Sequence, residues 1–229
     1  MTGADFVLTA HTADDQAEQV LLGLARGSGT RSLAGIPHRR GRVLRPFLGL
    51  RRADTEAVCV AEGLTPWEDP TNAQPVALRN RVRHELLPAL RRVLGEGIDA
   101  ALVRTARLAA QDAELLEELA GQLLEAAAVE ELPRVLGGAG DRVQGRAPLV
   151  WDVERLPLRE APPALSSRAL RRAVALVGGK TPSAERTAAL ERLMAGQGGA
   201  GPVQVDGHVS VSRVRLEDSR SVLRFQGLA

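Results

Sequence analysis

The chain has 229 residues, a hydrophobic content of 44% and a net charge of only +2, so it is long enough for one large or two small domains with a real apolar core. No segment approaches the roughly 20 apolar residues that a membrane span needs, and the first residues lack the pattern of a signal peptide. We therefore predict a cytoplasmic protein with no membrane partner. The single cysteine, Cys59, excludes an internal disulfide and is expected to be a buried core thiol.

The charges are unevenly distributed along the chain. The net charge is +3 over residues 1–92, −7 over 93–131 and +6 over 132–229, and 29 of the 30 basic residues are arginine. Arginine suits phosphate and carboxylate partners, but an arginine excess also follows from genomic base composition. The two basic blocks therefore permit RNA binding without establishing it. With three Phe, two Trp and no Tyr, base stacking on an aromatic platform is not expected.

The first predicted elements are a short buried strand over residues 5–10 and a helix that begins at Ala13. Thr12 and Asp15 resemble a capping box, and Gly27 is placed to end the helix. The apolar stripe of this helix has the spacing i, i+3, i+4 and i+7. Its members are Ala17, Val20, Leu21 and Leu24.

The middle of the chain is predicted to be mainly helical. A turn at Arg40-Gly41 leads into a short strand-like segment, a helix runs from Asp54 to Gly63, and residues 65–75 form a proline-rich loop. A second helix is expected over 76–94, with a break or kink at Pro88. Its expected inward residues are Leu78, Val82, Leu86 and Leu90. A long amphipathic helix follows over 99–131, about 50 Å in length unless Gly121 divides it.

The C-terminal part is predicted to be a small α+β domain that follows a glycine-rich segment, residues 134–148. It contains a strand or strand-helix edge over 149–156, helices over 166–177 and 182–194, and a hairpin at Asp206-Gly207. The predicted fold class is therefore α/β in three parts. These are an α/β part (1–95), a helical linker (96–132) and the small α+β domain (133–229).

Two carboxylates stand out in HTADDQAEQ, residues 11–19. On a helix, Asp15 and Glu18 lie about 60° apart and share a face away from the apolar stripe. They follow a strand end, which is where α/β sheets place their ligands. Acids in a first turn are also favoured by the helix dipole, so a purely structural role remains open. His11 is equally a ligand-facing residue or a partly buried one.

A second polar cluster is RNRVRH, residues 79–84. Arg79 and Arg83 are one helical turn apart, and Asn80 and His84 form an adjacent parallel stripe. Two stacked arginines suit a phosphate or a substrate carboxylate. The alternative is a solvated basic face.

Three motifs, AHTADDQAEQVLLGLARGSG (10–29), EDPTN (68–72) and RNRVRHELLPAL (79–90), together resemble the tRNA(Ile)-lysidine synthetase family of PP-loop ATP pyrophosphatases. The resemblance implies that residues 1–95 are the C-terminal remainder of an adenine-nucleotide alpha hydrolase-like, Rossmann-like domain that binds the nucleotide and lysine. It also implies that residues 133–229 are the family's small substrate-recognition domain. It also implies an ATP-dependent carbon-nitrogen ligase that adenylates C2 of the wobble cytidine of tRNA(Ile), joins lysine there and releases AMP, with Mg2+ expected. Relatives that thiolate tRNA cytidines use cysteines, and the lone Cys59 argues against that activity.

The same resemblance implies roles for individual residues. It places His11 on the ATP side of the site, and Asp15 and Glu18 at the lysine amino groups or magnesium. Arg83 and Arg79 would bind the lysine carboxylate or stabilise phosphate charge. Three further residues are candidate contacts of the tRNA or of another substrate. They are Arg26, Asn80 and His84.

The chain also departs from the family pattern. The SGGxDS phosphate loop occurs nowhere in the sequence, and its glycines and hydroxyls would cradle the ATP pyrophosphate. We therefore expect an N-terminally truncated member that is inactive alone. Two alternatives are a non-catalytic RNA-binding remnant and a purely structural two-domain helical protein.

Overall fold

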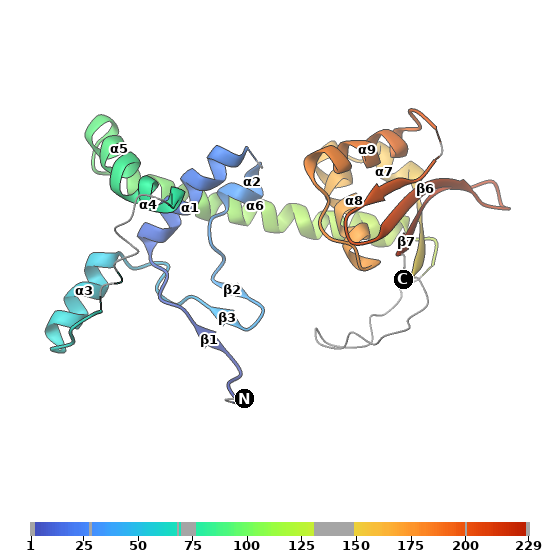
Figure 1. The fold of residues 1–229 in the computed structure, drawn as a ribbon. Helices are drawn as coiled ribbons and strands as arrows, with labels where there is room; N and C mark the ends of the chain where they lie inside the picture. The colour runs from blue at the N-terminus through green and yellow to red at the C-terminus, as the bar shows by residue number, and fades with distance from the viewer. Residues whose placement is uncertain are drawn as a thin grey trace. The chain divides into compact units, whose positions relative to one another are not determined.

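The structure is a computed structural model that describes residues 3–27, 29–67, 69, 77–130, 149–199 and 201–227 (Figure 1). The chain is a mixed α/β protein, as predicted, and divides into two compact units, residues 1–114 and 115–229. The long helix α6 (Ile98–Ala127) contributes its first part to unit 1 and its last part to unit 2. The boundary predicted after residue 132 lies outside the described residues. None of the described helices has the length and apolar composition to span a membrane.

Unit 1 combines helices with one small sheet. In this sheet β1 pairs in parallel with β3, and β2 pairs with β3 in the antiparallel direction. Before α6, its elements are β1 (Val7–Leu8), α1 (Ala13–Arg26), α2 (Thr30–Leu33), β2 (Arg39–Arg40), β3 (Val43–Leu44), α3 (Arg52–Ala61), α4 (Leu78–Arg81), the π-helical turn η2 (Val82–Leu86) and α5 (Leu87–Leu94).

The first strand is shorter and more exposed than predicted. Only Val7 and Leu8 form β1, and their side chains are 56% and 67% exposed. The strand lies at the edge of the sheet and has β3 as its one neighbour there. The apolar run thus identified a strand, but the prediction that it is buried is wrong for this structure, because burial depends on what packs against a strand and not on its own composition.

Helix α1 begins and ends where its capping signals predict. Thr12 and Asp15 form the capping box, and Gly27 is the left-handed C-cap with φ 61°. Ala17 and Val20 of the apolar stripe are buried, but Leu24 is 64% exposed, so its predicted burial is wrong. In this part of the helix the close neighbour is α2, which approaches Gly23 instead. A Cβ on Gly23 would lie 2.2 Å from the Ser32 carbonyl oxygen, so only glycine allows this contact.

The segment after residue 77 is helical but not uniformly α-helical. The turn η2 precedes Pro88, whose missing N–H and ring disfavour a regular α-helical turn before it. The wider turn shifts the inward face by one residue, so Val82 and Leu87 are buried, whereas Leu86 is 42% exposed. The predictions that Leu86 and the 54% exposed Leu78 face inward are therefore wrong.

Two other helices also differ from prediction. Helix α3 starts at Arg52 and contains no buried residue, so Cys59 is half-buried and not the expected core thiol. Helix α6 runs through Gly121 without a break. At that position α6 passes Arg172, whose guanidinium carbon would lie 3.5 Å from an added Cβ.

Unit 2 packs helices against a four-stranded antiparallel sheet with the order β4-β7-β6-β5 (Figure 1). The predicted hairpin at Asp206-Gly207 is present and pairs Val203 with Val211 and Val205 with Val209. The elements of unit 2 after α6 are β4 (Val150–Glu154), α7 (Arg155–Glu160), α8 (Pro163–Leu176), α9 (Ala184–Ala195), β5 (Val203–Val205), β6 (Val209–Arg215) and β7 (Ser221–Gly227).

The core of unit 2 lies between the sheet and its helices. Trp151 and Phe225, which face each other on β4 and β7, are 3% and 0% exposed, with ring centroids 6.4 Å apart. Leu170 of α8 and Leu190 of α9 close the core from the helical side. Buried and half-buried residues alternate over most of β6 and β7, which is the pattern of a sheet with one covered face. Val222 is buried next to Leu223 and is an exception.

Candidate functional site

The first turn of α1 fixes the position of Asp15. One oxygen of its carboxylate, Oδ2, accepts hydrogen bonds from the backbone N–H of Thr12 at 2.7 Å and from the Thr12 hydroxyl at 3.1 Å. This capping box leaves the other oxygen, Oδ1, available to groups outside the helix. Asp15 is therefore both a helix cap and a member of the cluster described next.

Glu18, one turn further along α1, is buried against two arginines. Its side chain is 1% exposed, and its carboxylate accepts hydrogen bonds from Nε of Arg79 at 2.7 Å and from Nε of Arg83 at 2.5 Å. The second nitrogen of each guanidinium reaches Oδ1 of Asp15, at 3.0 Å and 3.1 Å respectively. Both arginines thus bridge the two carboxylates. We call these four residues the ion cluster.

The two polar clusters of the sequence, residues 11–19 and 79–84, therefore contact each other. The carboxylates of the first form ion pairs with the arginines of the second. The spacing of Asp15 and Glu18 correctly put both carboxylates on one face, and the spacing of Arg79 and Arg83 did the same for the guanidinium groups. The acid face of α1 lies away from the apolar stripe but is not exposed to solvent, because arginines of the segment 78–86 cover it. Burial of a charged group carries a desolvation cost, and the opposite charges beside it offset that cost.

The electrostatics of the cluster favour the charged forms of Asp15 and Arg83. Burial alone would raise the pKa of Asp15, but the hydrogen bonds from Thr12 and the positive charges of Arg79 and Arg83 outweigh it and hold that pKa below its ordinary value. Burial alone would likewise lower the pKa of Arg83, and the hydrogen bond and charge of Glu18 raise it instead. Asp15 is consequently a carboxylate at neutral pH and suits the binding of a cation.

The other polar residues of HTADDQAEQ hold neighbouring segments in place. Asp14 accepts a hydrogen bond from the backbone N–H of Arg52 at 2.7 Å and so fixes the start of α3. Gln16 exchanges two hydrogen bonds with the backbone of Ile36, both 2.7 Å long. Gly35 makes this contact possible, because its φ is 70° and a Cβ there would lie 2.1 Å from the Gln16 amide oxygen. These contacts were not predicted, because each joins residues at least 20 positions apart.

His11 lies just before the first turn of α1 and is half-buried. Its Nδ1 is 2.9 Å from the hydroxyl of Thr9. That contact orients the ring, so a ligand at this end of the helix would meet Nε2. The hydrogen bond fits either of the two interpretations of His11 and does not by itself assign it to ATP.

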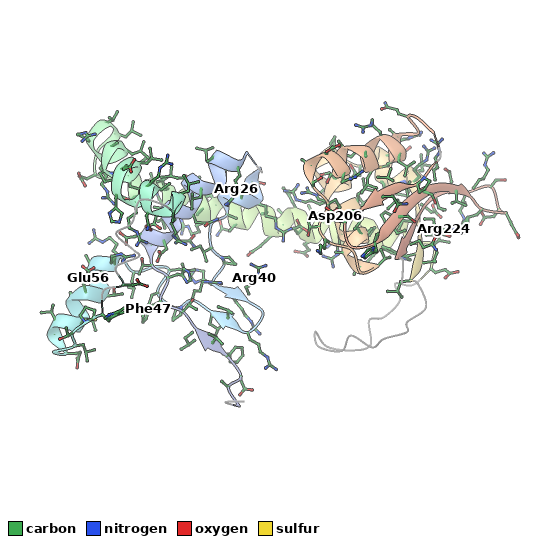
Figure 2. All side chains as sticks on the ribbon, viewed as in Figure 1. Arg26, Arg40, Phe47, Glu56, Asp206 and Arg224 are labelled. Atoms are coloured by element: carbon green, nitrogen blue, oxygen red, sulfur yellow. The ribbon has the colours of Figure 1, made fainter. Side chains whose placement is uncertain are left out.

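The remaining predicted site residues differ in their exposure. Arg26 is exposed in the last turn of α1 (Figure 2). Asn80 is half-buried and His84 is exposed. In the EDPTN motif, Asp69 is described and half-buried, while Glu68 and Asn72 lie outside the described residues. Within the part of the chain that the structure describes, no three His, Cys, Asp or Glu side chains are grouped to hold a metal ion.

Comparison with known protein families gives two matches. Residues 1–90 match the PP-loop domain family, and residues 154–227 match the family described as the TilS substrate binding domain. The first match contains the whole ion cluster. The second covers the helices α7 to α9 and the strands β5 to β7 of unit 2, and it begins at the last residue of β4.

Curated relatives match almost the whole chain. A protein of Leifsonia xyli subsp. xyli is 44% identical over 98% of this chain and 61% of its own length. Proteins of Streptomyces coelicolor and Nocardia farcinica are 40% and 43% identical over 97% and 96% of this chain, and over 58% and 64% of their own lengths. All three are named tRNA(Ile)-lysidine synthase. The chain thus spans about 60% of the length of these relatives.

Proposed function

We propose that this chain, which belongs to the tRNA(Ile)-lysidine synthase family, carries the lysine-binding part of an ATP-dependent ligase that modifies tRNA(Ile). The observation that supports the proposal is the ion cluster, since it brings HTADDQAEQ and RNRVRH, two of the motifs that resemble the family, into direct contact. In the proposed reaction the oxygen on C2 of the wobble cytidine attacks the α-phosphorus of ATP, and pyrophosphate leaves. The lysine side-chain ammonium then gives a proton to a carboxylate of the site, the resulting amine attacks C2, and AMP leaves with that oxygen.

In this proposal Asp15 and Glu18 bind the lysine ammonium. Two adjacent carboxylates bind and orient a cation, which places the amine for attack. The lowered pKa of Asp15 favours holding the ammonium over accepting its proton at the start of the reaction. The arginines already occupy both carboxylates, so the ammonium must displace one of them. Arg79 is the candidate for displacement because its side chain is 34% exposed, against 21% for Arg83.

Arg83 would then stay on Glu18, which it contacts through two of its nitrogens. A displaced Arg79 guanidinium would be available to the lysine carboxylate or to phosphate. The match to the PP-loop domain family supports ATP as the other substrate, with His11 on the nucleotide side and Mg2+ as the counterion of its phosphates. Arg26, Asn80 and His84 remain candidate contacts of the tRNA.

We also propose that residues 1–229 do not complete the ATP site, because the SGGxDS motif is absent from them. The test compares this chain with a longer version that carries the motif. Both are assayed for ATP-dependent incorporation of lysine into tRNA(Ile) and for tRNA binding. Incorporation by the longer version alone is the expected result. Folded protein that binds tRNA but incorporates lysine in neither version would contradict the enzyme proposal and support the RNA-binding alternative.

The Asp15→Asn variant of the active version tests the lysine site. Asn keeps an oxygen that can accept the Thr12 hydrogen bonds but removes the charge that would hold the ammonium. We expect lysine incorporation to fall by about 100-fold or more, with tRNA binding nearly unchanged. Asp54→Asn is a matched control, because Asp54 is the capping-box acid of α3 and accepts the Arg51 N–H at 2.8 Å outside the ion cluster.

The two variants separate catalysis from helix capping. If Asp54→Asn lowers incorporation as much as Asp15→Asn does, the loss comes from weakened capping in general. If Asp15→Asn lowers tRNA binding and incorporation equally, Asp15 acts through the fold of unit 1. A melting curve for each variant shows how much folded protein is present in each assay.

A further inference from the structure

A third arginine, Arg52, lies beside the ion cluster. Its Nη2 is 4.0 Å from Oδ1 of Asp15, the oxygen that already accepts hydrogen bonds from Arg79 and Arg83. A separation of 4.0 Å is too long for a hydrogen bond. Arg52 is therefore close enough to contact a group bound at Asp15, while the hydrogen bonds that hold this oxygen come from the other two arginines.

Two hydrogen bonds of the main chain fix the position of Arg52. It is the first residue of α3, and its N–H donates to Oδ2 of Asp14 at 2.7 Å. Two residues earlier, the carbonyl oxygen of Leu50 accepts a hydrogen bond from the N–H of Ala13 at 2.8 Å. The start of α3 is thus tied to the first turn of α1, which contains Asp15. Neither hydrogen bond uses the side chain of Arg52, so a substitution at this position leaves both in place.

The guanidinium group of Arg52 makes no hydrogen bond to any residue that the structure describes. Its side chain is 43% exposed, against 12% for that of Asp15. By contrast, Arg79 and Arg83 each use two of their nitrogens on the carboxylates of the ion cluster. A guanidinium group has five N–H donors. Arg52 can therefore bind an anion without first losing a hydrogen-bond partner in the described part of the protein.

The neighbouring residue Arg51 provides a comparison. Its side chain is 77% exposed, and its Nε lies 4.0 Å from Oδ2 of Asp54. That pair is formed within the first turn of α3 and lies outside the ion cluster. Arg51 and Arg52 thus carry the same charge at adjacent positions and approach an acid at the same distance. Of the two, Arg52 is the one whose acid belongs to the ion cluster.

The anion that Arg52 would meet depends on what Asp15 holds. In the proposed function, Asp15 and Glu18 hold the side-chain ammonium of lysine, so the nitrogen that attacks C2 lies next to Oδ1. The phosphate of the adenylated cytidine is joined to C2 through a single oxygen and must lie close to that nitrogen. The carboxylate of the same lysine is roughly 7 Å from the side-chain nitrogen when the lysine is extended, as standard bond lengths require. The phosphate is therefore the anion nearer to Arg52.

We propose that Arg52 binds the phosphate of the adenylated cytidine and stabilises the charge that this phosphate gains when AMP leaves. As the C2–N bond forms, the C2–O bond breaks and its electron pair goes to the phosphate oxygen. The ammonium has by then given one proton to a carboxylate of the site, and the attacking nitrogen loses a second one to solvent. The phosphate changes from a diester with one negative charge to a monoester with about two at neutral pH. A guanidinium group already in place stabilises this added charge.

This inference rests on the proposed function, and it predicts which of the two reaction steps depends on Arg52. In the first step the added negative charge develops on the departing pyrophosphate, and the phosphate that stays on the cytidine keeps a single charge. In the second step the added charge develops on the phosphate that Arg52 would contact. Removal of the guanidinium group should therefore slow the second step far more than the first.

The test uses the Arg52→Gln variant of the longer version that carries the SGGxDS motif. Adenylation is measured without lysine, as transfer of labelled AMP from ATP to tRNA(Ile). Lysine is then added, and the release of AMP is followed in a single turnover. We expect the second step to slow by about 100-fold, with adenylation and the half-saturating lysine concentration nearly unchanged. Arg52→Lys should restore part of the rate, because lysine keeps the charge but lacks the forked donor geometry.

Arg51→Gln is the matched control, since it removes the same charge one residue away, and both steps should keep their normal rates. Equal slowing of the two steps by Arg52→Gln would overturn the inference, as would a normal second step or an equal loss in the control. Lysine amide, which lacks the carboxylate charge, tests the other anion. A raised half-saturating concentration for lysine that disappears with lysine amide would assign Arg52 to the lysine carboxylate and would also overturn the inference.

Binding of AMP separates this inference from the proposed function. Titration calorimetry should show about tenfold weaker binding of AMP to Arg52→Gln than to Arg51→Gln. Adenosine, which lacks the phosphate, should bind equally to both variants. If the longer version makes no lysidine while this difference is found, the proposed function fails and the phosphate contact stands. If it makes lysidine and Arg52→Gln behaves like the unmodified protein in both assays, the reverse holds.

Discussion

The two units of the chain bury different kinds of side chain. Among the described residues of unit 2, a cluster of 19 buried hydrophobic residues joins the sheet to helices α6 to α9. Among those of unit 1, the corresponding cluster has three members, Ala17, Val82 and Leu87. The buried charged residues of the described chain, Asp15 and Glu18, both lie in unit 1. Apolar contacts therefore dominate the stability of unit 2, whereas ion pairs and hydrogen bonds carry a larger share in unit 1.

This difference has a consequence for function. An apolar core has many mutually supporting contacts and tolerates little rearrangement. A cluster of charged groups can exchange one partner for another of the same charge, and in the proposed function the lysine ammonium is such a partner for Asp15 and Glu18. The unit with the smaller core is thus the one whose stabilising contacts a ligand can take over.

The largest effect that we predict is the loss of stability in Phe225→Ala. Phe225 is fully buried against Trp151, and truncation of such a residue costs about 3 to 5 kcal/mol. The measurement is urea unfolding followed by the fluorescence of Trp151. Val150→Ala, at a position that is 48% exposed on the same sheet, should change stability by less than about 0.5 kcal/mol. Equal effects of the two variants would show that the apolar cluster does not dominate unit 2.

The next effect is that of Glu18→Gln on unit 1. Breaking a fully buried ion pair costs about 3 to 5 kcal/mol, and we expect about 2 to 3 kcal/mol here because Arg79 and Arg83 retain partial exposure and Asp15 remains as a partner. Hydrogen exchange of the α1 amides in the intact chain reports this loss. Glu56→Gln on the exposed side of α3 (Figure 2) is the control and should leave the exchange rates unchanged. If Glu18→Gln is also silent, the ion cluster does not stabilise unit 1.

The smallest effect concerns acid pH. The pKa of Asp15 is lower in the folded chain than its ordinary value of 3.8, so the charged form stabilises the fold. That stabilisation is complete above about pH 5 and is lost as the pH falls through the folded pKa. Hydrogen exchange in α1 should therefore accelerate with acid more steeply in the unmodified chain than in Asp15→Asn. Parallel pH profiles would contradict the lowered pKa.

Local sequence signals predicted the ends of several elements correctly. The capping box at Thr12 and Asp15, the left-handed Gly27 and the hairpin at Asp206-Gly207 all depend on residues a few positions apart. The same holds for the pairing geometry of Arg79 and Arg83, which follows from the pitch of a helix. Such features are determined within one or two turns of chain, so a short stretch of sequence contains the information they need.

Other predictions failed because they depended on packing. Leu24 belongs to the apolar stripe of α1 but is exposed, since α2 approaches the helix at Gly23. Leu86 was expected inside and Leu87 is buried in its place, because the π-helical turn before Pro88 rotates the segment. The local sequence around each of these leucines would be the same whether the leucine were buried or exposed. Only the element that packs against the helix decides its burial.

The sequence by itself determined the helical and strand periodicity, the caps and the motifs that resemble the lysidine synthetase family, because these are properties of neighbouring residues. The tertiary structure decided that Asp15 and Glu18 are covered by Arg79 and Arg83, and that Gln16 holds the backbone of Ile36. Each of these depends on the approach of segments distant in the chain. When such segments approach, they bring opposite or like charges beside a charged side chain, and these charges set its electrostatic free energy.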